Sequence, residues 1–545
     1  MEKLIIDLSG RGGLSKKFYG DIDGSGSNPH LRYLAKNGQL VAGKFNASRK
    51  YGFMSPNNTH FGTLSGADAS GSVLSNRWTT TLYDPDTQET YVGESNDITA
   101  TGYAWKANPG NPNANFDTLS DLGISTAAGS EFTDIEIYQL NGVKTVFFSY
   151  INSLGGDILQ YTSASTIAPQ WFVVNTNVEL SGSTHMFMRT ADNGFMYIFD
   201  VNKIHKVDGS AAGGATGTIT MSVMEFPGQI TITDAIDLRG SLWVAIQSST
   251  PTGFGGGTNY TVPSLSNICG IYIWDRKSTV SGTSNFISIS GVRDIRRLYT
   301  TEGGELRMIT ISSDGFTQIR RYNGNTFEVM VELGIKAYPV FKDSVAVTGQ
   351  FVTWLGRDGI IYSHGRLVEG EPEGLYIIGD ITSETGTNPS PGAIMMIGTG
   401  GYLGVEKEIW FCSEDSTQSA IYPRKFSPNL EGYAPNIGDV YTPVKLIPKL
   451  STVSTIDVFC APTTNTGTTE TATISVYTNM STTPFKVHSV TKDQTTRGYI
   501  RIPIDKPFVN SVQLKISWNP SVVIGDDTFL PMYAEVDYTP TKTAA

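Results

Sequence analysis

One pattern of polar and apolar positions recurs along the middle of the chain. A turn containing glycine is followed at once by a short apolar strand rich in aromatic residues, at a spacing of roughly fifty residues, which is typical of propeller repeats. The turns are Asn141-Gly142, Asn193-Gly194, Arg239-Gly240, Gly303-Gly304, Asp358-Gly359 and, less regularly, Gly400-Gly401. The strands that they precede lie at residues 146–148, 196–199, 242–244, 306–309, 360–362 and 409–411.

Each unit carries a further short strand, and together these strands predict a ring. The further strands are expected at 157–161, 203–207, 270–274, 317–322, 374–378 and 420–426. A hairpin signal at 77–94 adds one more unit. One small meander cannot bury both of its faces, whereas packing such meanders radially does so and removes exposed edges. We therefore expect an all-β chain with a β-propeller at 64–435, with seven blades as the preferred count and six as the alternative.

The pattern changes at about residue 441. Six alternating strands are expected at 453–459, 472–477, 485–490, 498–502, 511–518 and 531–538, separated by loops rich in Thr, Asn and Gly. This arrangement predicts a C-terminal β-sandwich of jelly-roll type at 441–545. Residues 1–63 are glycine-rich and read as an irregular N-terminal arm, with strand fragments at 3–8 and 39–45.

The composition agrees with an all-β protein and argues against some classes of binding partner. Charged residues make up 17% of the chain, glycines number 58, and the formal net charge is -11. An acidic surface argues against broad binding to nucleic acid and against insertion into an anionic membrane. No apolar stretch has the length of a membrane-spanning helix or the form of a signal peptide, so we expect synthesis in a cytoplasm. The three cysteines are far apart in the sequence, which argues against a disulfide framework and a CxxC zinc site.

No motif in the chain predicts catalysis, a metal or a cofactor. The six histidines do not have zinc-ligand spacing. Residues 21–28 resemble a calcium loop, but Arg32 stands where an EF-hand supplies Glu, and a flexible turn is the preferred interpretation. The glycine run at 253–257 has no P-loop Lys and reads as a loop. The turns at 191–195 and 312–317 resemble the Asp-boxes of sialidase-type propellers, which are structural hairpin turns.

Two groups of residues are candidates for contact with a ligand or a partner. Five arginines are concentrated in one predicted blade, where they could clamp an anion, cover a solvated strand face or form an ion-pair patch between subunits. They are Arg293, Arg296, Arg297, Arg320 and Arg321. In the sandwich, Tyr477 and Trp518 are the aromatic candidates for binding a glycan.

The first sixty residues resemble a known class of protein. Gly12-Gly13-Leu14, Asn28-Pro29-His30-Leu31, the segment from Gly38 to Asn46, and Arg49-Lys50-Tyr51-Gly52 form an ordered series. This series is similar to the opening of propeller-type virion proteins of tailed bacteriophages. In that family a propeller is commonly followed by a β-sandwich, and the proteins act through rigid surfaces that contact copies of themselves and neighbouring virion proteins.

The resemblance implies a structural protein of a phage tail, placed in a nozzle, a tip or a tail-associated ring and present in several copies. Its expected location is the virion after synthesis in the host cytoplasm, its expected partners are other virion proteins, and no enzymatic activity is expected. The alternative is a receptor- or glycan-binding adhesin of the same particle, with the sandwich as the module for host attachment. A propeller glycan hydrolase is the third hypothesis.

Overall fold

The computed structural model describes most of the propeller and sandwich strands. The described parts are residues 1–8, 77–95, 131–162, 186–209, 218–248, 268–278, 285–366, 373–380, 389–397, 408–415, 422–426, 439–462, 470–518 and 529–541, apart from a few positions within them, and the short strands noted below. Among these residues strands dominate, and the helical elements include the one-turn 3-10 helix η5 (Lys342–Ser344) and the short helix α2 (Lys492–Arg497). No helix among the described residues is long and apolar enough to span a membrane.

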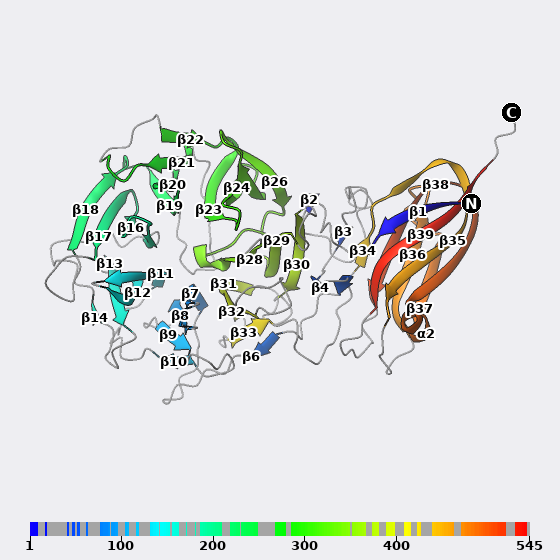
Figure 1. Ribbon diagram of the computed structural model, residues 1–545, viewed down its shortest axis with the longest axis horizontal. Coiled ribbons are helices and arrows are strands. Elements are labelled where there is room, and N and C mark those ends of the chain that lie inside the picture. Colours follow the sequence, from blue (N-terminus) through cyan, green and yellow to red (C-terminus); the bar gives the residue numbers. More distant parts are fainter. Residues whose placement is uncertain are drawn as a thin grey trace.

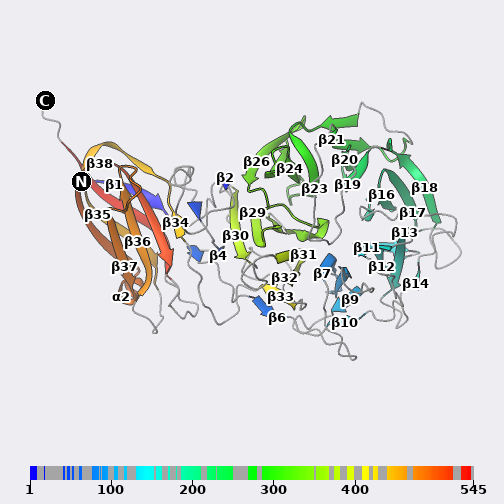
Figure 2. The same cartoon turned by 180° about the vertical axis from the view of Figure 1, so that it is seen from behind.

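Seven four-stranded units form a ring, as Figures 1 and 2 show. Within each unit the first strand lies nearest the centre of the ring and neighbouring strands pair antiparallel. Blades one to four are β7 (Arg77–Asp84), β8 (Glu89–Ser95), β9 (Ala104–Ala107) and β10 (Phe116–Thr118); β11 (Glu131–Leu140), β12 (Val143–Asn152), β13 (Gly155–Thr162) and β14 (Gln170–Trp171); β15 (Phe187–Thr190), β16 (Met196–Asp200), β17 (Lys203–Asp208) and β18 (Thr218–Glu225); and β19 (Thr231–Leu238), β20 (Ser241–Gln247), β21 (Cys269–Trp274) and β22 (Phe286–Ser288).

The remaining three blades complete the ring. They are β23 (Val292–Thr300), β24 (Leu306–Ser312), β25 (Thr317–Tyr322) and β26 (Phe327–Leu333); β27 (Val345–Thr348), β28 (Phe351–Leu355), β29 (Ile360–Gly365) and β30 (Gly374–Asp380); and β31 (Pro389–Ile397), β32 (Glu408–Asp415), β33 (Tyr422–Phe426) and β6 (Phe61–Thr63). The predicted β-propeller is confirmed, and seven, the preferred blade count, is the number of these units, of which the first two are joined in one sheet through β8 and β11.

The predicted glycine turns join strands within the blades. The glycine of each turn has a positive φ, between 73° and 81°; these residues are Gly142, Gly194, Gly240, Gly304 and Gly359. Residues with a side chain rarely adopt this left-handed conformation, so glycine is needed there. The Gly400-Gly401 turn lies outside the described residues.

Apolar side chains from neighbouring blades pack together and hold the ring. One buried cluster joins Phe187, Phe199 and Ile204 of blade three to Leu242 and Trp274 of blade four. Equivalent clusters join blades two and three and blades four and five. Blades two to five therefore depend on their neighbours for much of their core, as expected for a propeller.

The C-terminal domain is a two-layered β-sandwich in which two long strands take part in both layers. Its strands are β34 (Asp439–Tyr441), β35 (Lys445–Ala461), β36 (Glu470–Thr478), β37 (Lys486–Thr491), β38 (Tyr499–Trp518) and β39 (Leu530–Pro540). The first part of β38 pairs with the second part of β35, which pairs with β39. The second part of β38 pairs with β36 on one side and with β34 and the start of β35 on the other. The separate strands expected at 498–502 and 511–518 are thus one continuous, bent strand.

The expected irregular N-terminal arm is corrected by its strand pairing. β1 (Glu2–Asp7) matches the predicted fragment at 3–8 and is an edge strand of the sandwich beside β39. β3 (Val41–Ala42) pairs with β34 of the sandwich, whereas β2 (Lys17–Phe18) adds to blade five beside β26. β6 pairs with β33 and supplies the outer strand of blade seven. The predicted boundary at 64 therefore separates strands that belong to the same sheets, whereas the sandwich begins with β34, at the predicted boundary of 441. The last two strands, β4 (Asn46–Arg49) and β5 (Gly52–Met54), pair with each other.

Candidate functional site: a network of ion pairs at the propeller axis

The innermost strands of four blades share a local irregularity. A register shift falls between Trp78 and Thr80 in β7, and the same shift recurs at Phe132/Asp134 in β11, Ile232/Asp234 in β19 and Val292/Asp294 in β23. Such a β-bulge bends a strand and redirects its side chains. Three of the four bulges are followed by an aspartate, so the bulge sets a carboxylate on the inner strand of three blades.

Two of these aspartates tie their blade to the next one. The Met188 amide donates to Asp134 Oδ2 at 2.6 Å, and the Leu298 amide donates to Asp234 Oδ2 at 2.7 Å. Both carboxylates are almost completely buried. A carboxylate that accepts a backbone N–H forms a charge-assisted hydrogen bond, which is stronger than a neutral one. The inner strands of blades two and three, and of blades four and five, are joined in this way.

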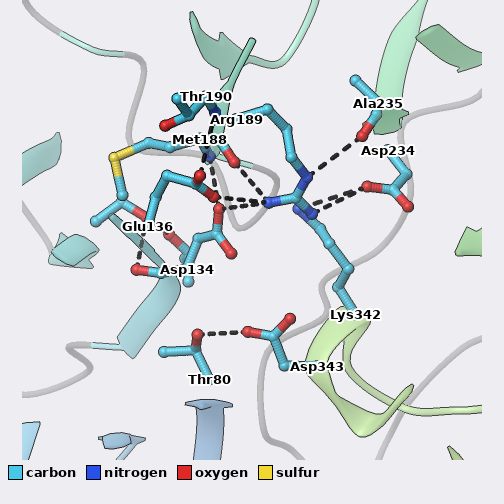
Figure 3. A network of polar contacts seen from close by, with 12 residues as sticks. Thr80, Asp134, Glu136, Met188, Arg189, Thr190, Asp234, Ala235, Lys342 and Asp343 are labelled. Atoms are coloured by element: carbon cyan, nitrogen blue, oxygen red, sulfur yellow. Dashed lines mark hydrogen bonds and ion pairs between the residues drawn. The ribbon is translucent and has the colours of Figure 1, made fainter. Parts of the chain in front are cut away.

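Arg189 of blade three lies between the two aspartates, as Figure 3 shows. Its Nη1 is 3.1 Å from Asp134 Oδ2 and its Nη2 is 3.2 Å from Asp234 Oδ1. Glu136 approaches Nη1 at 3.8 Å, and Nε donates to the carbonyl oxygen of Ala235 at 3.3 Å. One guanidinium group therefore bridges blades two, three and four at the centre of the ring.

The short helix η5, which precedes blade six in the sequence, adds two further charged side chains to this group. η5 lies beside β7 and β31, and its Asp343 Oδ2 accepts a 2.5 Å hydrogen bond from the Thr80 hydroxyl. Lys342 Nζ lies 3.9 Å from Asp234 Oδ1 and 3.3 Å from the centre of the Phe187 ring. Arg297 Nη1 of blade five lies 3.8 Å from Asp343 Oδ1. We call Thr80, Asp134, Glu136, Arg189, Asp234, Arg297, Lys342 and Asp343 the axial network.

Burial and mutual attraction set the protonation of the axial network. The cations around Asp234 hold its pKa below the ordinary value even though burial opposes ionisation, and the nearby carboxylates raise the pKa of Arg189. Burial raises the pKa of Glu136 to about 7 and lowers that of Lys342 to about 7. Burial also raises the pKa of Asp343. The network thus combines a firmly ionised centre, formed by Arg189 and Asp234, with groups that titrate near neutral pH.

The axial network acts on the fold by joining blades that are distant in the sequence. Its residues come from the inner strands of blades one to five and from η5. Each described carboxylate in it already has a cation, an amide or a hydroxyl within contact distance. Removing one member of a buried ionic group leaves its partner uncompensated, which is strongly unfavourable. The arrangement therefore holds the centre of the ring in one geometry.

Comparison with known proteins yields structural similarity but no family. No family model matches the chain, and no curated protein matches its sequence. YCF48 from Cyanidioschyzon merolae is 10% identical and covers 68% of this chain and 98% of its own, with a TM-score of 0.40. The β-propeller domain of Myceliophteria thermophila Cps50 (Swd1) is 10% identical and covers 68% and 99%, with a TM-score of 0.37. An exo-β-1,3-galactanase from Phanerochaete chrysosporium is 10% identical and covers 89% and 100%, with a TM-score of 0.31.

These similarities carry no information about function. All three TM-scores are below 0.5 and the sequence identities are low. The seven blades are instead established by the strand pairing of this chain itself.

The five predicted arginines do not form one anion clamp. Arg297 belongs to the axial network, whereas the buried Arg296 pairs with Asp294 at 2.7 Å. Arg320 is also buried and donates to Gln318 Oε1 at 2.7 and 3.0 Å. As buried side chains, Arg296 and Arg320 do not offer a surface contact, which corrects that part of the prediction.

The other two arginines lie nearer to solvent. Arg293 is half-buried beside the turn at Gly315, where an added Cβ would lie 3.2 Å from its Nη2. Arg321 is exposed and pairs with Glu328. Of the five, it is therefore the one that the structure leaves most accessible to a partner.

Of the two aromatic candidates of the sandwich, Tyr477 has a described side chain and Trp518 does not. Tyr477 is buried, and its ring lies 6.2 Å from that of Tyr441. It packs inside the domain and does not present a glycan-binding face, so this prediction is wrong. Trp518 ends β38, but its side chain lies outside the described residues.

The remaining residues that the sequence analysis considered as metal, thiol or phosphate sites are either buried in the fold or lie outside the described residues. His205 is buried, and its Nδ1 accepts a 2.9 Å hydrogen bond from the Ser222 amide, as expected of a strand histidine. Cys269 and Cys460 are buried and free, and burial raises the pKa of Cys460 to about 11. The calcium-like segment 21–28 and the glycine run 253–257 are not described. Within the parts that are, no group of three or more His, Cys, Asp or Glu side chains could hold a metal ion.

The two Asp-box-like turns are hairpin turns of one kind. The Ala191 amide donates to the Phe195 carbonyl and the Gly194 amide to the Ala191 carbonyl, at 2.9 and 3.1 Å. Ser312, Gly315 and Phe316 repeat this pattern at 2.8 and 3.0 Å. Both turns are thus closed by backbone hydrogen bonds, which agrees with the structural interpretation.

Titration of two buried carboxyl groups, Glu136 of the axial network and Asp294 of blade five, predicts a stability that rises as the pH falls from 7. Burial raises the pKa of Glu136 and of Asp294 to about 7, well above the ordinary values of 4.5 and 3.8. At a pH between the ordinary pKa of each group and its raised pKa in the folded state, the folded chain binds protons that the unfolded chain does not, so acidification favours folding. We expect the free energy of unfolding to increase by about 1–3 kcal/mol between pH 7.5 and about pH 5. Chemical denaturation across this range measures it.

A matched pair of variants isolates the contribution of one carboxyl group. Glu136→Gln should raise stability above pH 7 and reduce the gain on acidification, because glutamine carries no charge to desolvate. Glu328→Gln, on the exposed side of blade five, should leave the pH profile unchanged. A Glu136→Gln profile identical to that of the wild type would contradict the assignment.

Proposed function

We propose that this protein is a structural component of a tailed-bacteriophage virion, placed in the tail, where it acts through protein–protein interfaces. The single observation that favours a structural role is the axial network. It places charged side chains from blades two to five and from η5 together at the centre of the propeller, where they are paired with one another. These side chains fix the geometry of the ring.

The strands near the N-terminus give further support to a role as a scaffold. β1 and β3 pair within the sandwich, whereas β2 and β6 pair within the propeller. One segment of chain is therefore tied by backbone hydrogen bonds to both domains. A protein that transmits position through an assembly benefits from such connections, because relative motion of domains is otherwise the default expectation.

The assignment to a phage tail rests on the sequence resemblance of residues 12–52. Much of this segment lies outside the described residues, although β2, β3, β4 and the start of β5 fall within it. The fold that the resemblance implies, a propeller followed by a sandwich, is the fold of this chain. The position within the tail and the copy number are part of the same proposal.

Immunogold electron microscopy tests the proposed location. Antibodies raised against the purified protein should label particles from the culture or sample that yielded the sequence, with gold confined to the tail. Mass spectrometry of gradient-purified particles should contain its peptides in proportion to the other tail proteins. Tailed particles that lack both the label and the peptides would contradict the proposal, whereas label on the capsid would correct the location.

The alternative functions receive no specific support from the described residues. For the adhesin, Tyr477 is buried. For the hydrolase, the carboxylates at the axis of the ring are engaged in ion pairs and hydrogen bonds. The structural role is therefore the function that the geometry favours.

A further inference from the structure

One end of the sandwich gathers large apolar side chains in solvent. Among the described residues thirteen large hydrophobic side chains are exposed, and six of them lie in three neighbouring segments of this domain. They are Leu446, Leu450, Met480, Phe485, Val487 and Phe508. Isolated exposed apolar residues are normal on protein surfaces, but a concentration of this kind marks an interaction surface.

Backbone contacts show that the three segments lie side by side. Leu446 pairs with Ser511 and Ser451 with Val509 across the sheet. The turn after β36 is held to β38 because the Asn479 amide donates to the Ser511 carbonyl at 3.0 Å. Asn479 Nδ2 also donates to the Phe508 carbonyl at 3.0 Å. We call residues 445–450, 479–487 and 505–510 the distal surface.

The backbone of the distal surface is held in an unfavourable conformation. Of eight described non-glycine residues with positive φ, four are here: Asn479, Met480, Asp505 and Phe508. For Met480 and Phe508 the angles are 54° and 57°. A bulky residue rarely adopts the left-handed region, and conformations of this kind are concentrated at functional surfaces. Phe508 is thus disfavoured twice, by its backbone and by the 60% exposure of its side chain.

The charge of the distal surface is opposite to that of the rest of the protein. Its segments contain four lysines and a single acidic residue, Asp505; the lysines are Lys445, Lys449, Lys486 and Lys506. Residues 439–545 as a whole hold nine Lys or Arg and nine Asp or Glu, so the entire formal charge of -11 lies in the remaining residues. The propeller part is therefore acidic, and a basic, apolar surface is complementary to it.

We propose that the distal surface docks on the acidic propeller of a second copy of this chain. Phe508 and Met480 supply apolar anchors, and the lysines steer the approach and fix the orientation. The two contacting surfaces differ, so the contact is heterologous, and repetition of it closes into a ring or continues as a filament. This deepens the proposed structural role by naming one interface, and it concerns the purified protein, so it can fail while the tail location stands.

Sedimentation velocity of the full-length protein over a range of protein and salt concentrations tests the contact. The wild type should associate reversibly, and more weakly at high salt because the surface charges are then screened. Phe508→Asn and Met480→Asn remove the apolar anchors while keeping a residue that tolerates positive φ. Each should weaken association roughly tenfold or more, as expected for an anchor residue.

Control variants separate loss of contact from loss of fold. Ile5, on the β1 edge of the same domain, is 60% exposed, as Phe508 is, and Ile5→Thr should leave association unchanged. Lys449→Glu should weaken association most at low salt. Circular dichroism and thermal unfolding confirm that each variant is folded.

Three results would overturn the proposal. The first is a wild-type protein that stays monomeric at all concentrations and at low salt. The second is association that folded Phe508→Asn and Met480→Asn variants retain in full. The third is binding of the wild type, lost in these variants, to vesicles of anionic phospholipid while association is unaffected, since the occupant would then be a lipid surface.

Discussion

Replacing Arg189 by methionine is expected to destabilise the protein by about 3–5 kcal/mol, because the change leaves buried carboxylates without their cation. Arg189 lies within 3.2 Å of both Asp134 and Asp234, and neither aspartate has access to solvent. Methionine fills a similar volume, so the loss of charge is the main effect. Equilibrium denaturation in urea measures it, and native-state hydrogen exchange should show faster opening of blades two, three and four.

Two further variants show that the effect comes from the buried charge. Neutralising the partners in Arg189→Met/Asp134→Asn/Asp234→Asn should recover part of the lost stability, since no buried carboxylate then remains uncompensated at these positions. Arg321→Met breaks an ion pair in which both side chains are over 40% exposed, and it should cost at most about 1 kcal/mol. Equal losses for Arg189→Met and Arg321→Met would show that burial of the network has no energetic consequence.

Deleting residues 1–8 is expected to destabilise the sandwich although the deleted residues are far from it in the sequence. Ile6 and Leu8 are at most 1% exposed, and each large apolar side chain contributes about 1.5–3 kcal/mol when buried. The deletion also exposes β39, which then becomes an edge strand. We expect a lower unfolding temperature for the sandwich by scanning calorimetry and a greater tendency to aggregate.

A longer deletion and a point variant test whether the two domains respond separately. Deletion of residues 1–64 also removes β6, so hydrogen exchange in β33 should increase, whereas deletion of 1–8 should leave β33 protected. Ile6→Ala should cost about 2–5 kcal/mol without shortening the chain. An unfolding temperature unaffected by either change would mean that β1 is not needed for the sandwich.

The sequence was sufficient to predict the ring and the sandwich because both follow from local patterns. Glycine turns such as Asn193-Gly194 demand a left-handed residue, and the apolar strands after them recur at regular spacing. The strands that pair with β1 and β6 could not be predicted from such local patterns. Pairing of Ile6 with Ala534, or of Phe61 with Phe426, joins positions with most of the chain between them.

The axial network could not be predicted from the sequence because charged residues in a strand usually indicate a face exposed to solvent. Arg297 belongs to a run of arginines for which an anion clamp, a solvated strand face and a patch between subunits are all compatible with the sequence, yet it lies at the axis with Asp343. The signal that could have revealed the network is the repeated pair Thr-Asp, which stands near the start of two inner strands as Thr133-Asp134 and Thr233-Asp234. An acidic residue at the same place in several repeats points inward to a shared axis, whereas a solvent-facing position has no reason to repeat.

The pairing of β1 and β6 has a consequence for the order in which the protein can fold. During synthesis β6 leaves the ribosome before any blade and must wait for β33, and β1 must wait until β39 has been made. Neither the ring nor the sandwich can be completed while translation is still in progress through the propeller. Contacts between residues so far apart in sequence also slow folding. A chain that stops early therefore keeps an open blade and an exposed sheet edge, at which another chain can pair and start aggregation.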